Sequence, residues 1–346
     1  MSTATATKPK PKPTTSRTPL ARATGAIRGT FTSPKYGPVL VTAILFLAVF
    51  AGGGLRYRGF FSGQVLLNLL VDNAYLIVLA VGMTFVILTG GIDLSVGAVV
   101  ALSTMIAATL LQSGWPAAAV IPLILVLTST LGLLVGLMIQ YFKVQPFIAT
   151  LAAMFLARGL CYVISQSSIS ITDPTFIAFG VTRIPLGGKM SITPSVIIAV
   201  LVVIIAVWVL HATRFGRTVY ALGGSEQSGL LMGLPVARTK VLVYTVSGLC
   251  SGLAGVLFTF YTLSGYPLSA IGTELDAIAA VVIGGTLLTG GYGFVLGSVL
   301  GVLVLGIIQT IITFEGTLSS WWTRIFIGGL LLVFIILQKL LTSRRR

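Results

Sequence analysis

Residues 65–88 read VLLNLLVDNAYLIVLAVGMTFVIL, an apolar run that contains a single acidic side chain, Asp72. A helix of about 20 apolar residues is long enough to cross the hydrocarbon core of a bilayer. Runs of this kind recur along the chain, which is 56% hydrophobic and only 8% charged, whereas soluble domains carry about 25% charged residues. The sequence therefore predicts an all-α polytopic membrane protein.

Ten such runs predict about ten transmembrane helices. They lie at 38–54, 65–88, 94–112, 117–140, 146–166, 194–211, 241–262, 274–288, 294–314 and 321–340. We therefore expect a transmembrane domain over 36–340, between a basic tail at 1–35 and a basic C-terminus at 341–346. The tail holds seven Lys and Arg and several prolines. This composition favours a disordered, solvated segment, although contact with anionic lipid or a role as a transit peptide stays open.

The positively charged residues are distributed unevenly between the two sides of the membrane. With a cytoplasmic N-terminus and ten crossings, sixteen Lys and Arg lie on the cytoplasmic side and five on the outer side. Cytoplasmic loops of membrane proteins carry an excess of these residues. The count therefore predicts that both termini are cytoplasmic.

Several kinds of chemistry are excluded by composition. His211 is the only histidine, and Cys161 and Cys250 both lie within apolar runs. The sequence thus offers no disulfide framework, zinc site or Ser–His hydrolase. It also contains no phosphate-binding GxxxxGK[ST] loop, so we expect the chain neither to hold a cofactor nor to bind ATP itself.

Polar side chains within the second and fifth predicted helices are candidates for a solute path. Asn68 and Asp72 lie on one stripe of the second helix, and Asn73 is the next residue. At 1.5 Å per residue, Asp72 lies about 15 Å deep, near the bilayer midplane, and Arg158 lies at a comparable depth in the fifth helix. An ionised group there is costly unless it is paired or hydrated. Asp72 and Arg158 therefore either pair with each other or line an aqueous path for a hydroxyl-rich solute.

Acidic residues next to apolar runs predict helix caps. Asp93 precedes the 94–112 run and predicts an N-cap. Glu274 and Asp276 lie in a Thr-Glu-Leu-Asp sequence that begins at Thr273 and predicts a capping box. In the ten-helix topology these two acids face the outer mouth, where an extracytoplasmic binding protein could dock. Capping and docking both stay open for this pair.

Residues 212–240 form the longest predicted cytoplasmic loop and carry five charged residues. Within the loop, Ser225–Leu234 predicts a short helix that Gly233 helps to end. Such a loop could dock a cytosolic partner or serve as an ordinary connector. Elsewhere, a Leu-Thr-Gly-Gly sequence occurs at 88–91 and again at 288–291, which predicts Gly-Gly breaks between tightly packed helices.

Three stretches carry a recognisable pattern. They are GMTFVILTGGIDLSVG at 82–97, RFGR through ALGG at 214–224, and AAVVIGGT at 279–286 with the glycine pair at 290–291. Together they resemble the permeases of monosaccharide ABC importers of the ribose, xylose and arabinose class. Shorter stretches at 72–74, 274–277 and 316–322 are similar to the permeases of galactofuranose importers.

The resemblance implies an ABC importer permease fold and a transport subunit without enzyme activity. It implies import of a monosaccharide, with galactofuranose the favoured sugar, by alternating access across a bacterial inner membrane. It also implies three partners: an ATPase subunit that binds ATP, a second permease subunit that is different or identical, and an extracytoplasmic sugar-binding protein.

The resemblance further implies that the 212–240 loop transmits closure of the ATPase. The candidate contact residues are Arg214, Phe215, Gly216, Arg217, Glu226 and Gly233. In the family this loop commonly reads Gly-Gly-Asn, whereas Ser225 stands in the place of the Asn here. Detailed docking contacts therefore do not transfer from the family.

Two other functional classes are alternatives to the importer permease. An ATP-independent secondary sugar transporter or channel would need no docking loop, and proton coupling would need more membrane carboxylates than this chain has. An intramembrane hydrolase would need a serine beside His211, which lies at the end of a predicted helix. The sequence favours the importer permease over both.

Overall fold

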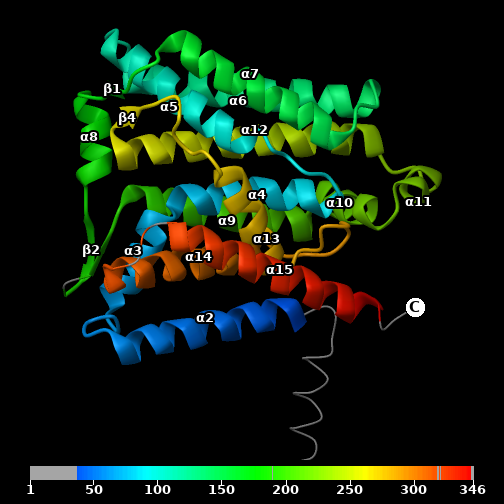
Figure 1. Cartoon of the computed structure of the whole chain (residues 1–346). Coiled ribbons are helices and arrows are strands. Elements are labelled where there is room, and N and C mark those ends of the chain that lie inside the picture. The colour runs from blue at the N-terminus through cyan, green and yellow to red at the C-terminus, as the bar shows by residue number, and fades with distance from the viewer. Residues whose placement is uncertain (1–36, 189, 318, 320, 344–346) are drawn as a thin grey trace, which may run out of the picture.

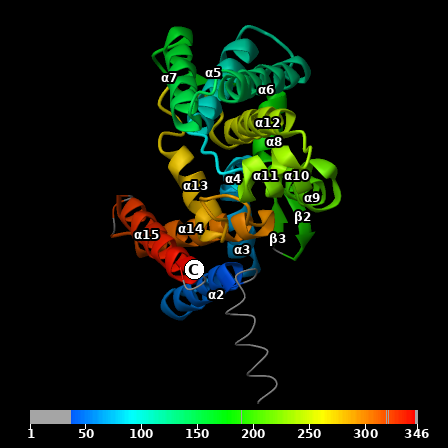
Figure 2. The same cartoon turned by 90° about the vertical axis from the view of Figure 1, so that its right-hand side faces the viewer.

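Long apolar helices form most of the described chain and lie side by side along one common direction (Figures 1 and 2). The computed structural model describes residues 37–188, 190–317, 319 and 321–343. Within these residues, six helices are long and apolar enough to cross a membrane. They are α2 (Gly37–Arg56), α6 (Ala117–Tyr141), α7 (Pro146–Ile164), α9 (Pro194–Ala212), α12 (Val236–Thr262) and α14 (Val295–Glu315).

A seventh span is built from two helices, α3 (Gly63–Asp72) and α4 (Ala74–Leu88), which meet at an angle of 59°. Two further apolar helices, α5 (Val96–Gln112) and α15 (Trp321–Ser343), have shorter apolar segments. The eighth predicted helix, at 274–288, is the 11-residue α13 (Thr273–Ile283). The polytopic all-α fold is confirmed, but the count of ten spanning helices is not.

The two ends of the helix bundle carry different short elements (Figure 1). One end holds α8 (Pro174–Val181) and two small antiparallel sheets. The sheets pair β1 (Ile169–Ser170) with β4 (Ser264–Gly265), and β2 (Ile184–Gly187) with β3 (Met190–Ile192).

The other end holds α10 (Arg214–Gly224) and α11 (Glu226–Leu231). The described chain begins at α2 and ends at α15 on this same side (Figure 1). An even number of passes through the bundle follows. The predicted tail at 1–35 lies outside the described residues, as do residues 344–346 of the predicted basic C-terminus.

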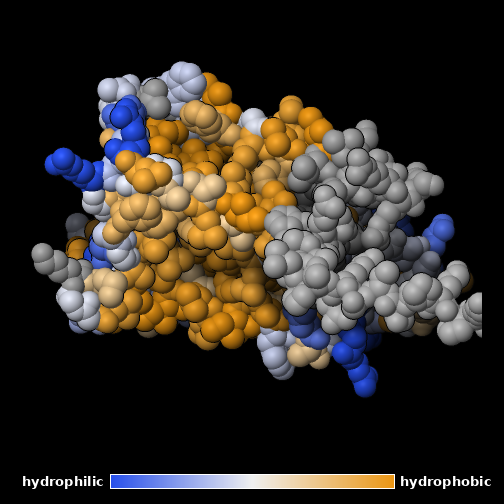
Figure 3. Space-filling model, turned by 90° about the horizontal axis from the view of Figure 1, so that it is seen from below, coloured by the Kyte–Doolittle hydropathy of each residue, from blue (hydrophilic) through white to orange (hydrophobic). Residues whose placement is uncertain are grey.

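Helix α4 is the centre of the hydrophobic core. All but one of its residues are buried, and it packs against α12, α9, α13 and α14. Its sequence is apolar on every side, which is typical of a helix surrounded by other helices. A bilayer would contact the outer helices instead, and Figure 3 shows a broad hydrophobic band with hydrophilic residues gathered near both ends.

Small residues lie at the most extensive helix contact among the described residues, between α12 and α6. A Cβ atom at Gly248 would lie 3.1 Å from the Cα of Gly132, and would clash with the Thr128 carbonyl oxygen. Membrane helices use small residues in this way because their backbones can then approach closely. The glycines of α12 thus allow this long helix to pack closely against α6.

Candidate functional site

The break between α3 and α4 falls at Asn73, inside the run predicted as one continuous helix at 65–88. The Asn73 side chain donates from Nδ2 to the backbone oxygen of Leu69 at 2.9 Å. Asn side chains compete in this way with the helical backbone. Gly306 of α14 makes room for the bend, because a Cβ atom there would lie 2.5 Å from the Asn73 Nδ2. The single-helix prediction is therefore wrong at this point.

Two adjacent hollows open beside the bend, with volumes of about 430 Å³ and about 370 Å³. Asn73, Tyr75 and Gln309 line both. The larger hollow is also lined by Val65, Asn68, Asp72, Phe258, Tyr261, Gly306, Thr310, Thr313 and Phe314. The smaller one is also lined by Leu76, Asp276, Leu305, Trp321, Thr323, Arg324 and Ile327.

The hollows gather carboxylate, amide, hydroxyl, guanidinium and aromatic groups in a chain that is otherwise apolar. Asp72 and Gln309 are exposed, although they lie on helices of the spanning bundle. Polar residues at membrane depth usually face a water-filled cavity or a protein partner, because lipid cannot satisfy them. This face of the chain is therefore suited to a polar solute or to another subunit.

Three of the four predicted path residues, Asn68, Asp72 and Asn73, line the larger hollow. The fourth, Arg158, is not among the lining residues. Its Nη1 donates to the backbone oxygens of Pro267 at 2.5 Å and of Ser269 at 2.8 Å.

No ion pair joins Arg158 to Asp72 within the described residues. The pairing alternative is therefore wrong. The physical reason is that backbone carbonyl oxygens of the segment before α13 accept the hydrogen bonds of the guanidinium group instead.

Sequence reasoning missed several lining residues. Gln309 is a lone amide within the apolar run of α14, and that isolation was a usable signal. Tyr261 and Arg324 carried no comparable signal, because they lie at helix ends where polar residues are common. Only the packing of α12, α14 and α15 around the bend brings them together.

Glu274 and Asp276 lie at the first turn of α13, which crosses the middle of the bundle (Figures 1 and 2). The N-cap is Gly272 and not Thr273, so the predicted capping box does not form. The Glu274 Oε1 does accept from the Gly272 backbone N–H at 3.2 Å.

The other oxygen of Glu274, Oε2, lies against Gly97 at the first turn of α5, and Asp276 lines the smaller hollow. Both acids therefore lie within the bundle and not on an end surface. Contact of either residue with a binding protein stays a prediction.

A cluster near the larger hollow joins the ends of α2 and α14. The Tyr57 hydroxyl donates to the Glu315 carboxylate, and this hydrogen bond raises the pKa of Tyr57. The same carboxylate lies 3.9 Å from the Arg56 guanidinium, which is mostly exposed. Screening by water makes such a pair weak, so the cluster orients the helix ends more than it stabilises them.

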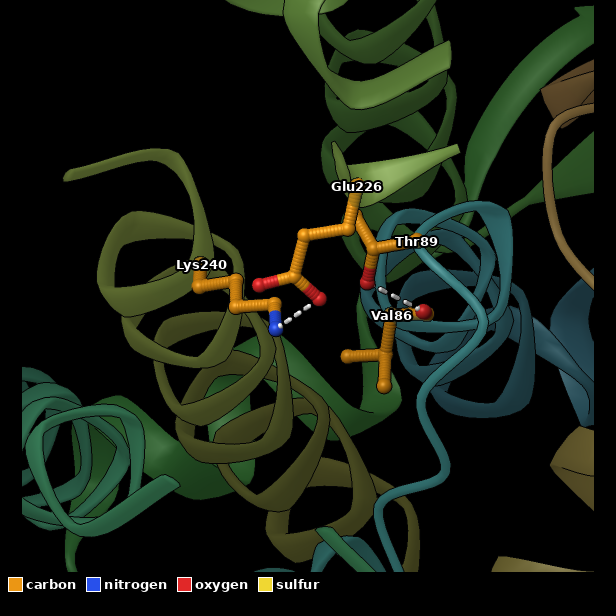
Figure 4. A network of polar contacts seen from close by, with 4 residues as sticks. All are labelled: Val86, Thr89, Glu226 and Lys240. Carbon is orange, nitrogen blue, oxygen red and sulfur yellow. Dashed lines mark hydrogen bonds and ion pairs between the residues drawn. The ribbon is translucent and has the colours of Figure 1, made fainter. Parts of the chain in front are cut away.

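The predicted short helix in the 212–240 loop is present as α11, and the Ser225 hydroxyl accepts from the Ser228 N–H at its N-terminus. The loop also contains α10, which the sequence did not indicate. Lys240 Nζ lies 2.6 Å from Glu226 Oε2, so α11 is tied to the start of α12. Figure 4 shows this ion pair beside the end of α4, where the Thr89 hydroxyl donates to the Val86 oxygen.

The six predicted contact residues of this loop divide into two groups. Arg214, Arg217 and Gly233 are exposed and Glu226 is half-buried, so these four are accessible to a partner. Phe215 and Gly216 face inward: the Phe215 ring stacks on Phe85 at 6.1 Å, and Gly216 packs on the Leu210 backbone. The last two residues are therefore structural.

An exposed apolar group at the tip of this loop was not predicted. Leu231 is 90% exposed, and Leu230 and Met232 are also exposed. Leu230 and Leu231 are the last residues of α11 and Met232 follows them, at one end of the bundle (Figure 1). Apolar side chains gathered at an aqueous surface mark sites of protein contact.

Comparison with known proteins shows the family of the chain. Residues 65–335 match the family described as "Branched-chain amino acid transport system / permease component". The chain is 46% identical to the inner membrane ABC transporter permease protein YjfF of Escherichia coli, over 88% of this chain and 92% of that protein. No solved structure matches the chain.

Two further relatives are named for sugars. The fructose import permease protein FruG of Bifidobacterium longum is 43% identical over 87% of this chain and 90% of its own length. The ribose import permease protein RbsC of Bacillus subtilis is 39% identical over 88% and 92%. The protein is thus a multi-pass transport subunit and not an enzyme, and ATP hydrolysis belongs to a separate subunit. By these matches, the chain belongs to the family of ABC transporter permeases that contains the ribose and fructose import permeases.

Proposed function

We propose that this chain forms part of the sugar path of an ATP-driven monosaccharide importer, and that the two hollows at the α3–α4 bend belong to that path. The observation that carries the proposal is the set of polar groups that lines these hollows. Carboxylate, amide and guanidinium groups hydrogen-bond hydroxyls, and aromatic faces such as that of Tyr261 suit the apolar face of a sugar ring.

The sugar we propose is galactofuranose. Support comes from the short stretches at 72–74, 274–277 and 316–322, which resemble permeases of galactofuranose importers. All three stretches contain residues that line the hollows, namely Asp72 and Asn73, then Asp276, and then Trp321. Ribose and fructose, for which two of the relatives are named, are the competing substrates.

The partners we propose follow from the two polar ends and the open hollows. The ATPase subunit, which binds the ATP, docks on the end that carries α10 and α11. This end faces the cytoplasm together with both termini, and the basic tail contacts anionic lipid. A second permease, different from this chain or identical to it, covers the hollows, and a sugar-binding protein delivers the sugar from the outside.

The test is reconstitution in proteoliposomes with the ATPase, permease and binding protein encoded by neighbouring genes. Uptake of labelled galactofuranose should require ATP and the binding protein, and should exceed uptake of ribose and fructose. Uptake that persists with an ATPase unable to hydrolyse ATP would favour the secondary-transporter alternative instead.

A single substitution tests the path itself. Asp72→Asn removes a charge from the larger hollow and should lower uptake roughly tenfold, the factor expected for loss of one hydrogen bond to a charged group. Thr130→Ala is the matched control, because Thr130 is exposed on α6 and bonds only to the Val126 oxygen of its own helix. Equal uptake by the two variants would exclude Asp72 from the path.

A further inference from the structure

Three glycine-containing segments that are distant in the sequence meet at the end of the bundle that carries α10 and α11. They are the turn after α4, the turn between α13 and α14, and the last turn of α10. The Gly291 N–H donates to the Leu88 oxygen at 2.9 Å. A Cβ atom at Gly223 of α10 would clash with both of these bonded groups. The three backbones are therefore in direct contact, with no side chain between them.

The two turns also touch each other through their first glycines. A Cβ atom at Gly290 would lie 2.7 Å from the Gly90 nitrogen and 3.0 Å from the Gly223 Cα. Gly90, Gly290 and Gly291 have φ angles of +78°, +84° and +76°, a conformation that glycine adopts without strain. The predicted Gly-Gly breaks between tightly packed helices are thus confirmed, and α10 is the third member of the contact.

A side-chain hydrogen bond forms a second contact between α10 and the turn that joins α13 to α14. The Tyr220 hydroxyl donates to the Gly293 oxygen at 2.9 Å. Burial raises the pKa of Tyr220 to about 12, so the hydroxyl keeps its proton at neutral pH and remains a donor. Tyr220 and Gly223 lie one turn apart on α10, and both contact the segment between Gly290 and Gly293.

The helices that leave this contact are those that line the hollows. Helix α4 runs from Asn73 and Tyr75 to the turn, about 22 Å at 1.5 Å per residue. Helix α14 runs from the turn to Gln309, and α13 carries Asp276. The glycine contact and the hollows therefore lie toward opposite ends of the same helices. Packed helices move as rigid bodies, because their close-packed contacts do not deform continuously.

We propose that Tyr220 and Gly223 are positioning residues that transmit movement of α10 to α4, α13 and α14, and thereby open and close the hollows to the sugar. The inference rests on the proposed function, in which the ATPase docks on the end that carries α10. It adds the point at which that movement enters the membrane helices. Phe215 gives α10 a further contact with α4, since its ring stacks on Phe85.

The test uses the complete importer in proteoliposomes and Tyr220→Phe, which removes the bond to Gly293 and leaves the ring in place. The readout is labelled galactofuranose transported per ATP hydrolysed, or ribose if that is the sugar the unmodified importer transports. This ratio should fall about fivefold, the factor that corresponds to one neutral hydrogen bond, while the ATPase still co-purifies. Tyr141→Phe is the control, because Tyr141 is an exposed tyrosine at the same end of the bundle.

A glycine pair gives a second measurement. Gly223→Ala should lower the ratio further or prevent assembly, whereas Gly224→Ala should do neither, because a Cβ atom at Gly224 meets nothing within 4 Å. An unchanged ratio in Tyr220→Phe would overturn the inference. So would loss of ATPase co-purification in that variant, because Tyr220 would then be a docking residue. Failure of the unmodified importer to take up sugar would instead overturn the proposed function.

Discussion

The Ser247 hydroxyl donates a 2.7 Å hydrogen bond to the Oδ2 of Asp93, and this bond joins the segment between α4 and α5 to the middle of α12. The other oxygen of Asp93 accepts from both the N–H and the hydroxyl of Ser95. Ser95, and not Asp93, is the N-cap residue of α5. The cap prediction was therefore wrong, because the carboxylate is used to fasten a turn to a neighbouring helix.

Ser247→Ala should destabilise the protein more than Ser251→Ala does. Ser247 donates to a buried carboxylate, and such hydrogen bonds contribute about 1.5–3 kcal/mol, whereas a neutral one contributes roughly 1 kcal/mol. Ser251 is equally buried, but it donates only to the Ser247 backbone oxygen. Thermal unfolding of the two purified variants checks this, and equal unfolding midpoints would contradict it.

Arg158→Gln and Asp72→Asn should act independently. Arg158→Gln removes the donor from two backbone oxygens and should cost about 1–3 kcal/mol, because Pro267 is buried. Asp72 has no part in that contact. In a double-mutant cycle the two stability changes should therefore add to within roughly 0.5 kcal/mol. A larger coupling would mean that the residues interact after all.

Gly97→Ala and Gly159→Ala should have opposite effects, although both glycines lie within helices. A Cβ atom at Gly97 would lie 2.9 Å from the Ala270 oxygen and would clash with the Glu274 carboxylate, whereas one at Gly159 meets nothing within 4 Å. Overpacking costs about 1–3 kcal/mol, while alanine stabilises an open helical position by roughly 0.5–1 kcal/mol. Unfolding midpoints should move down for the first variant and up for the second.

Leu231→Asp should weaken binding of the ATPase subunit. Leu231 is 90% exposed at the tip of the loop, so the substitution has no effect on folding, and any loss reports on docking. Leu186→Asp is the control, because Leu186 is also exposed but lies in β2 at the opposite end of the bundle. Co-purification of the ATPase should fall for the first variant only. Equal recovery with both would remove the loop tip from the interface.

The positions of the long helices could be predicted because each one needs a long apolar run to satisfy its own backbone in lipid. The runs at 117–140 and 294–314 match α6 and α14 to within one residue at either end. The Gly-Gly turns at 88–91 and 288–291 were also predictable, since a glycine pair between two apolar runs indicates a break between helices.

The parts that could not be predicted depend on contacts between distant residues. Arg158 binds a segment about 110 residues away, and no local pattern specifies that partner. The α3–α4 bend lies inside an apolar run, where Asn73 is too weak a signal to mark a break. The course of α13 across the bundle depends on Gly301 of α14, where a Cβ atom would clash with the Ala280 backbone.

Helix α13 has a consequence for how the chain is made. Its 11 residues span about 16 Å, roughly half of the hydrocarbon core, so the insertion machinery cannot release it into lipid as an independent segment. The backbone groups at both of its ends need protein neighbours, which α5 and α14 supply. Because α14 follows α13 in the chain, the hollows that residues of α13 and α14 line are completed only after α14 has left the ribosome. Until then, the centre of the newly made subunit has to be sheltered from the bilayer.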